Sequence, residues 1–171
     1  MKKILILVDD LYEDLELWYP RLRLQEAGIG ALVAGPKSST VYRGKYGYPC
    51  LSDMEFLEAE EPDFDGLLIP GGYAPDKLRR YPKVLELTQQ FHVSKKCIGF
   101  ICHGGWVPIS AKILKGRKVT GTEAIKDDFE NAGAIWKDKE VVIDENLVSS
   151  RTPKDLPLFA KSLLDTIHKK A

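Results

Sequence analysis

The sequence has no excess of charge of either sign. Lysine and arginine together number 25, aspartate and glutamate also number 25, and neither sign is gathered into a block of its own. Proteins that bind nucleic acid carry a surplus of basic residues, because these residues neutralise the phosphates. The balance of charge therefore argues against a nucleic-acid partner.

Long hydrophobic runs are missing as well. The apolar run near the N-terminus, within Lys3–Val8, is short and ends at Asp9 and Asp10. The apolar core of a signal peptide needs about 7–15 residues, and a membrane-spanning helix needs about 20. The sequence therefore predicts a soluble cytoplasmic protein with no membrane partner.

Cysteine and histidine are scarce, with three residues of each type. They are Cys50, Cys97 and Cys102, and His92, His103 and His168. An odd number of cysteines without regular spacing suits a reducing compartment better than a disulfide framework. The histidines are too far apart for a helical two-histidine metal motif. We therefore predict no metal site and no cofactor, and we expect Cys50 and Cys97 to be buried thiols.

Repeats, low-complexity segments and linkers are also absent, so we expect 1–171 to form a single domain. Short apolar runs alternate with segments of helical periodicity, which favours an α/β sandwich with a mainly parallel sheet. Strands are predicted at 3–8, 29–34, 65–70 and 97–102 and near 134–136 and 141–143, with a hairpin or edge excursion at 40–51. Helices are predicted between the first two strands, at 82–93, 107–114 and 124–132, and at the C-terminus.

Candidate functional residues follow three of the predicted strands. In parallel sheets, ligands bind beyond the carboxyl ends of the strands, where loops and helix N-termini converge. The three sets are Asp9, Asp10, Glu13 and Asp14; Gly71, Gly72 and Asp76; and Cys102, His103 and Gly104. We therefore expect the chemistry to be concentrated at this edge of the sheet.

The stretch Cys97–Trp106, with the sequence CIGFICHGGW, changes character at Cys102. A strand, a tight turn and a helix around a nucleophile form an elbow, which exposes the side chain and needs small neighbours such as Gly104 and Gly105. Backbone N–H groups and the positive end of the following helix favour the nucleophilic thiolate. Packing alone also explains a cysteine at the end of an apolar run. The residues by themselves leave both interpretations open.

Four segments occur in order along the chain: ILVDDLYEDLEL, LLIPGGYAPD, GFICHGGW and IKDDFENAGA. Together they resemble the ThiJ/PfpI family, in particular its intracellular-protease-like branch, from Lys3 to the last helix. The resemblance implies a flavodoxin-like fold of the class I glutamine amidotransferase-like superfamily, with helices on both faces of the sheet. It also implies that Cys102 is a nucleophile at a strained elbow after a central strand.

The resemblance places a carboxyl group from the first loop against the cysteine sulfur, and Glu13 holds the matching position. A protonated carboxyl donates a hydrogen bond to a thiolate, so the two groups would titrate as one coupled unit. A charge that meets the dipole at a helix N-terminus would account for Glu13 equally well.

The resemblance assigns His103 as the general acid or base. In protease-like members, the acid that orients this histidine comes from a PGG-x-x-P-E segment of a neighbouring subunit. Asp76 stands at that position and is one methylene shorter. The resemblance therefore implies a homodimer or a larger homo-oligomer, with an orienting role for Asp76 that the shorter side chain puts in question.

The backbone N–H groups of Gly72 and His103 are implied to form the oxyanion hole. The pocket around them is expected to include Gly71, Gly104 and Trp106. Gly105 stands where family members often have proline, which should loosen the start of the helix without removing the elbow.

Two classes of function fit these residues. We rank a cysteine-dependent hydrolase of the intracellular protease type first, and a glyoxalase or deglycase acting on methylglyoxal or its adducts second. Both chemistries need a thiolate, a proton carrier and an oxyanion stabiliser. The other class is a redox-sensing or chaperone-like stress protein in which Cys102 is oxidised. His103 favours catalysis, because a sensor needs no adjacent proton carrier.

Overall fold

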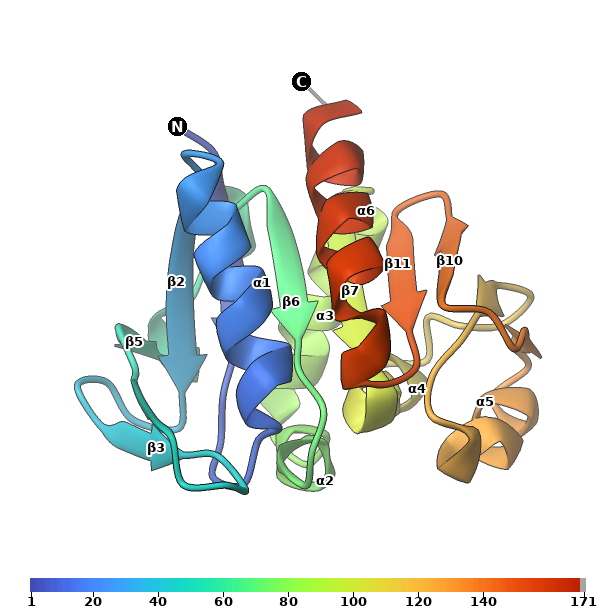
Figure 1. Ribbon diagram of the computed structural model, residues 1–171, viewed down its shortest axis with the longest axis horizontal. Coiled ribbons are helices and arrows are strands. Elements are labelled where there is room, and N and C mark those ends of the chain that lie inside the picture. Colours follow the sequence, from blue (N-terminus) through green and yellow to red (C-terminus); the bar gives the residue numbers. More distant parts are fainter. Residues whose placement is uncertain (170–171) are drawn as a thin grey trace.

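A seven-stranded sheet forms the centre of the protein (Figure 1). In this computed structural model, which describes residues 1–169, the strand order is β10-β11-β7-β6-β1-β2-β5. The strands are β1 (Lys3–Leu7), β2 (Gly30–Gly35), β5 (Met54–Glu55), β6 (Gly66–Ile69), β7 (Cys97–Ile101), β10 (Val141–Asp144) and β11 (Leu147–Ser150). Neighbouring strands are parallel except for β10 and β11. The mainly parallel sheet that the sequence predicts is confirmed.

Helices cover both faces of the sheet (Figure 1). On one face, α1 (Asp14–Glu26) packs beside α6 (Leu156–Lys169), and on the other α3 (Pro82–Val93) packs beside α4 (Trp106–Ser110). The short helices α2 (Ala74–Leu78) and α5 (Lys126–Asn131) lie at the end toward which the parallel strands point. This three-layer arrangement is the predicted flavodoxin-like sandwich.

Two small sheets complete the fold. The segment predicted as a hairpin or edge excursion is an antiparallel hairpin of β3 (Val41–Arg43) and β4 (Pro49–Leu51), and β8 (Lys118–Val119) runs parallel to β9 (Ile135–Trp136). Helix α4 ends at Ser110, short of the predicted 114, and Lys112 beyond it has a positive φ of 59°. A residue in the left-handed region cannot continue a right-handed helix.

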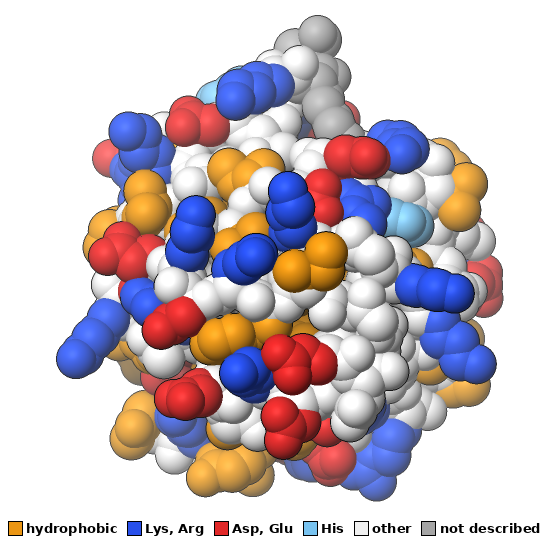
Figure 2. Space-filling model, turned by 90° about the vertical axis from the view of Figure 1, so that its right-hand side faces the viewer, with side chains coloured by type: hydrophobic (Ala, Val, Ile, Leu, Met, Phe, Trp, Pro, Cys, Tyr) orange, Lys and Arg blue, Asp and Glu red, His pale blue; other side chains and the backbone are white. Residues whose placement is uncertain are grey.

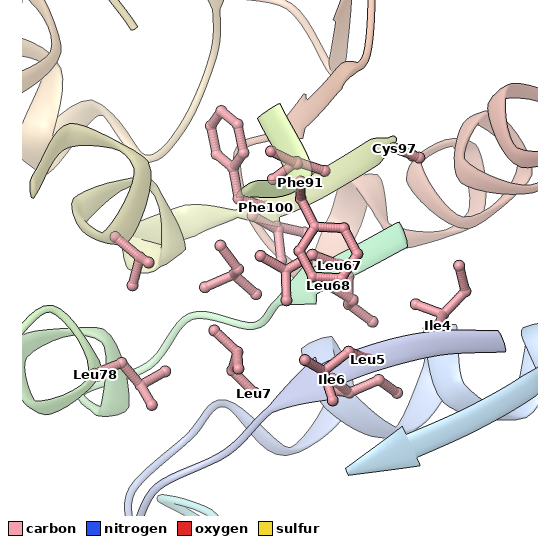
Figure 3. Close-up of a cluster of buried hydrophobic side chains, with 14 of the residues drawn as sticks. Ile4, Leu5, Ile6, Leu7, Leu67, Leu68, Leu78, Phe91, Cys97 and Phe100 are labelled. Atoms are coloured by element: carbon pink, nitrogen blue, oxygen red, sulfur yellow. The ribbon is translucent and has the colours of Figure 1, made fainter. Parts of the chain in front are cut away.

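The core lies between the sheet and its two helical layers. Figure 3 shows Ile4, Leu5, Ile6 and Leu7 of β1 in the same cluster as side chains of β6, β7 and α3. These four residues are at most 2% exposed. Successive strand residues point to opposite faces, and both faces are covered, so a continuous apolar run is needed rather than an alternating one.

Strand β10 is one of the two edge strands of the sheet, and β5 is the other. Figure 2 shows the side of the molecule that lies on the right in Figure 1, where basic and acidic side chains are interspersed. Lys118, Lys137 and Lys139 line a shallow hollow beside Val141–Ile143. Charged side chains along an edge strand oppose its pairing with another chain. No helix within residues 1–169 is long and apolar enough to cross a membrane.

The turn after β7 lies against α5 through one glycine. A Cβ built on Gly105 would be 2.1 Å from Cζ of Phe129, a fully buried residue of α5. The backbone of Gly105 has ordinary helical angles, φ −59° and ψ −21°. Glycine is therefore required here by the space that the Phe129 ring occupies, and no unusual backbone conformation is involved.

We expect Gly105→Ala to destabilise the fold by about 1–3 kcal/mol, because the added methyl group overpacks the contact with Phe129. Helix propensity alone would make alanine more stable than glycine at this position. The cost should shrink in a Phe129→Leu background, where the ring is absent. A double-mutant cycle measured by urea denaturation checks this, and an equal cost in both backgrounds would contradict it.

Candidate active site

Three loops meet at the carboxyl ends of β1, β6 and β7. Because these strands are neighbours and parallel, the residues that follow them come together at one edge of the sheet. Tyr12 and Gly72 form an isolated β-bridge between the first two loops, and the Glu13 N–H donates to the Gly71 carbonyl at 3.0 Å. The third loop carries Cys102.

Cys102 occupies a strained position. It begins a single 3₁₀ turn, Cys102–Gly105, that joins β7 to α4, and its φ is 59°. A residue other than glycine in this left-handed region has a backbone strain of about 1–3 kcal/mol, which contacts with the surrounding structure must offset. A Cβ on Gly104 would lie 2.5 Å from the Ile69 carbonyl oxygen, so only glycine lets the turn approach β6 so closely. The geometry is the nucleophile elbow that the resemblance implies.

Two backbone N–H groups donate to the Cys102 sulfur. They belong to Gly72 and His103, and both lower the pKa of the thiol. Gly72 has a φ of 82°, and a Cβ at this position would be 2.4 Å from the Glu13 nitrogen. The pair expected to form the oxyanion hole thus lies at the sulfur.

The carboxyl group beside the sulfur belongs to Glu16, not to Glu13. Glu16 is fully buried, its Oε2 accepts a 2.7 Å hydrogen bond from the Gly71 N–H, and its side chain interacts with Cys102. Glu13 caps α1 instead, with Oε2 accepting from the Glu16 N–H at 2.9 Å. The sequence-based placement of Glu13 against the sulfur is therefore wrong. The two acids are only three positions apart, so the sequence pattern does not distinguish them. Glu13 is the N-cap of α1, whereas Glu16 lies in its first turn and points toward the sulfur.

Burial dominates the ionisation of this pair. Burial, together with the charge of Glu13, raises the pKa of Glu16 to about 8. Burial and the charge of Glu16 raise the pKa of Cys102 to about 12. The second cause acts only while Glu16 is ionised. Near neutral pH Glu16 keeps its proton, so its carboxyl can donate to the sulfur, and the two groups titrate as a coupled unit.

His103 lies beside the nucleophile, with Nδ1 3.4 Å from the Cys102 sulfur. Burial lowers the pKa of His103, the positive charge of Lys45 lowers it further, and the negative charge of Asp128 opposes both. The imidazole is thus placed to exchange a proton with the sulfur or with a group bound to it.

Asp76 is not brought to His103 within one chain. It lies in α2, is exposed, and forms an ion pair with Arg80 one helical turn later, at 2.8 Å. An acid lent by a neighbouring subunit stays a prediction.

The remaining sequence-based candidates lie around the elbow. A Cβ on Gly71 would be 2.4 Å from Glu16 Oε2 and 2.8 Å from Cys102 Cβ, so this glycine lets the carboxyl and the cysteine meet. Trp106 is half-buried and presents its ring to His103, with centroids 5.1 Å apart. Cys50 and Cys97 are buried, as expected. Within residues 1–169, no three metal-ligating side chains cluster.

Sequence reasoning missed three residues of the site: Glu16, Lys45 and Asp128. Lys45 lies at the tip of the β3–β4 hairpin, and its N–H donates to the Tyr12 carbonyl at 2.8 Å. Its positive charge lowers the pKa of Glu16, Cys102 and His103. Helical spacing was the available signal for Glu16, but nothing in the local sequence links the hairpin or α5 to the elbow.

The raised pKa of Glu16 can be tested through the pH dependence of the free energy of unfolding. The folded protein keeps this proton between pH 4.5 and about 8, where the unfolded chain has lost it. The free energy of unfolding should therefore fall as pH rises through this window, by at most about 1.4 kcal/mol per pH unit from this group. Glu16→Gln cannot titrate and should lack the fall.

Urea denaturation of both proteins at pH values across that window is the measurement. Glu13→Gln is the matched control. It leaves the buried carboxyl in place and should keep the fall, over a window that ends at a lower pH because the charge of Glu13 no longer raises the pKa of Glu16. An identical pH dependence in Glu16→Gln and in the wild type would show that Glu16 is ionised throughout.

Known proteins resemble this chain over nearly all its length. The DJ-1/PfpI family matches residues 2–166. Deglycase PfpI of Pyrococcus furiosus is 44% identical over 90% of this chain and 92% of its own. A cysteine protease candidate of Bacillus subtilis, YraA, is 40% identical over 97% and 98%.

A solved structure from Anabaena variabilis has the same fold as this chain. It is a two-domain protein with a DJ-1/ThiJ/PfpI-like and a ferritin-like domain, 37% identical to this chain. The match has a TM-score of 0.96 and covers 98% of this chain and 48% of that one. On the strength of the family match, the identity to these relatives and the elbow geometry, the chain belongs to the DJ-1/PfpI family.

Proposed function

We propose that this protein is a cysteine-dependent deglycase or glyoxalase that acts on methylglyoxal or its adducts. The observation that supports it most is the convergence on the Cys102 sulfur of the Glu16 carboxyl, the His103 ring and two backbone N–H groups. The similarity to a relative named a deglycase favours this chemistry over the peptide hydrolase that the sequence ranked first.

The reaction would begin with addition of the sulfur to the aldehyde carbon of methylglyoxal. A carbon–sulfur bond forms, the carbonyl π bond breaks, and its oxygen takes up a proton to give a hemithioacetal. The N–H groups of Gly72 and His103 would stabilise the negative oxygen before it is protonated. With an amine adduct, the sulfur displaces the amine, which leaves with a proton.

The proton carrier then acts on the adduct. His103 removes the proton from the carbon bonded to sulfur, and the resulting enediol is protonated on the neighbouring carbon, which gives a lactic acid thioester. Water hydrolyses the thioester to lactate and releases the thiol. One carbon is oxidised and its neighbour is reduced, so methylglyoxal and water balance lactate with no outside oxidant or reductant.

A peptide hydrolase is the second candidate, supported by the similarity to YraA. The same sulfur, histidine and N–H groups would serve acyl transfer from an amide. A stress protein that is oxidised at Cys102 remains the candidate of another class. With each function we propose a cytoplasmic location, because a reducing compartment keeps a nucleophilic thiol reduced.

We expect the purified protein to convert methylglyoxal to lactate, and Cys102→Ser to lose at least about 10³-fold in kcat/KM, because the oxygen nucleophile is far less ionised. Cys97→Ala is the control and should retain activity, since Cys97 lies in β7 away from the loops. Lactate is measured directly, alongside a fluorogenic peptide and the mass of the protein.

Peptide cleavage without lactate would establish the hydrolase instead. A mass increase of two oxygens at Cys102 without turnover of either substrate would establish the oxidation sensor.

We also propose that the chain works as a homodimer or a larger homo-oligomer. Two apolar residues of α1, Leu15 and Leu22, face away from the core and are 57% and 56% exposed. With Trp18, Tyr46 and Tyr48 they line one hollow between α1 and the hairpin, which we call the α1–hairpin face. Contiguous exposed apolar surface of this kind marks interfaces, and a second copy of the chain would cover it.

Sedimentation velocity tests the assembly. The wild type should sediment as a dimer or a larger species at micromolar concentration, and Leu22→Glu should shift it toward the monomer, because a charge would be buried in the interface. Leu57→Glu is the matched control, since Leu57 is 72% exposed but lies outside the α1–hairpin face. A monomeric wild type would contradict the proposal and, with it, any acid lent by the Asp76 of a neighbour.

A further inference from the structure

His103 has neighbours in its own chain besides Cys102. Its ring meets the ring of Trp106 edge to face, with centroids 5.1 Å apart and planes at 65°. His103 lies in the 3₁₀ turn Cys102–Gly105, and Trp106, three positions later, is the first residue of α4, so the two rings lie on one side of this continuous stretch. The position of the Trp106 ring therefore limits where the imidazole can lie.

The Trp106 ring is itself held from two other elements. Its Nε1–H donates a 2.9 Å hydrogen bond to Oδ2 of Asp128 in α5. The guanidinium of Arg79, which caps the C-terminus of α2, lies 5.2 Å from the ring centroid. Arg79 is fixed in turn by a 2.8 Å hydrogen bond from its Nε to the Ser110 Oγ. Contacts from α2 and α5 thus define the orientation of this tryptophan.

Asp128 also contributes charge. The groups that act on the ionisation of His103 are the Lys45 ammonium from the hairpin, which opposes the imidazolium, and the Asp128 carboxylate, which favours it. The other charges nearby are the Arg79 guanidinium, across the Trp106 ring, and the Glu16 carboxyl, which acts on Cys102. Asp128 is thus a carboxylate of the same chain that favours a protonated His103.

We propose that Trp106 and Asp128 are positioning residues that hold and tune His103 from within one chain. Trp106 keeps Nδ1 of the imidazole facing the sulfur, and Asp128 fixes Trp106 and stabilises the imidazolium that forms when His103 takes up a proton. An orienting carboxylate is therefore available without Asp76 of a neighbouring subunit. The effect on turnover rests on the proposed dicarbonyl chemistry, whereas the effect on the histidine does not.

Two variants separate geometry from charge. Trp106→Phe keeps an aromatic ring beside His103 and Arg79 but removes the Nε1–H donor, so the ring loses its tie to α5. Asp128→Asn keeps an oxygen acceptor for Trp106 but removes the negative charge. Asp127→Asn is the matched control, because Asp127 is an exposed carboxylate of the same helical turn and takes no part in the bond to Trp106.

The first measurement is the NMR titration of the His103 imidazole, which needs no substrate. We expect Asp128→Asn to lower the pKa of His103 relative to Asp127→Asn, because the carboxylate that stabilises the imidazolium is gone. The acid limb of kcat/KM for methylglyoxal should move to lower pH in step. An unchanged His103 titration in Asp128→Asn would overturn the proposal, even if the protein turned over no dicarbonyl.

The second measurement concerns geometry. We expect Trp106→Phe to lower kcat about tenfold with KM little changed, because the imidazole is no longer held in its productive orientation. If methylglyoxal is not a substrate, iodoacetamide alkylation of Cys102 replaces turnover, and its rate should fall relative to Asp127→Asn. A Trp106→Phe protein with wild-type kcat, or with a wild-type alkylation rate, would overturn the positioning role.

Discussion

The close approach of three loop backbones is the constraint on which this site depends. Gly71 and Gly104 each occupy a point where a Cβ would collide with the neighbouring loop, the former against Glu16 and Cys102 and the latter against Ile69. Removing that side-chain volume brings the N–H of Gly72, the sulfur and a buried carboxyl within reach of one another. The positive φ of Cys102 persists because this packing leaves the turn no relaxed alternative.

The close approach of the loops also explains why Glu16 is protonated. Glu16 sits where burial and a neighbouring carboxylate both disfavour its charge, so a carboxyl proton is available at neutral pH beside a thiol that burial also keeps protonated. Once this pair has lost one proton, either the carboxyl or the sulfur can hold the proton that is left. The N–H groups and the Lys45 charge lower the free energy of the thiolate, and the protonated carboxyl adds a donor to it. Reactivity at Cys102 is thus a property of the cluster rather than of the helix that follows it.

The Glu13 prediction failed for an instructive reason. Residues 13 and 16 both follow β1 and lie one helical turn apart, so a resemblance in sequence places an acid in this loop without saying which one points inward. Helix capping determines which acid reaches the sulfur, because the Glu13 carboxylate accepts a hydrogen bond from the Glu16 N–H at the start of α1 and is held there. The apolar residues of the same helix show the same ambiguity about which side faces the core. Periodicity identified a helix correctly, but Leu15 and Leu22 face away from the core.

The sequence by itself determined the mainly parallel sheet and the hairpin or edge excursion, because apolar runs and turn residues are local signals. The residues around Cys102 left packing and an elbow both open, and the resemblance of four ordered segments favoured the elbow. The sequence also placed Gly72, His103 and Cys102 at one edge, since neighbouring parallel strands end together. Only the tertiary structure decided that Lys45 and Asp128 act on His103. These residues lie 58 positions before and 25 positions after His103 in the chain. No local propensity encodes which hairpin tip or helix turn will dock against the elbow, because that choice depends on packing of the whole sandwich.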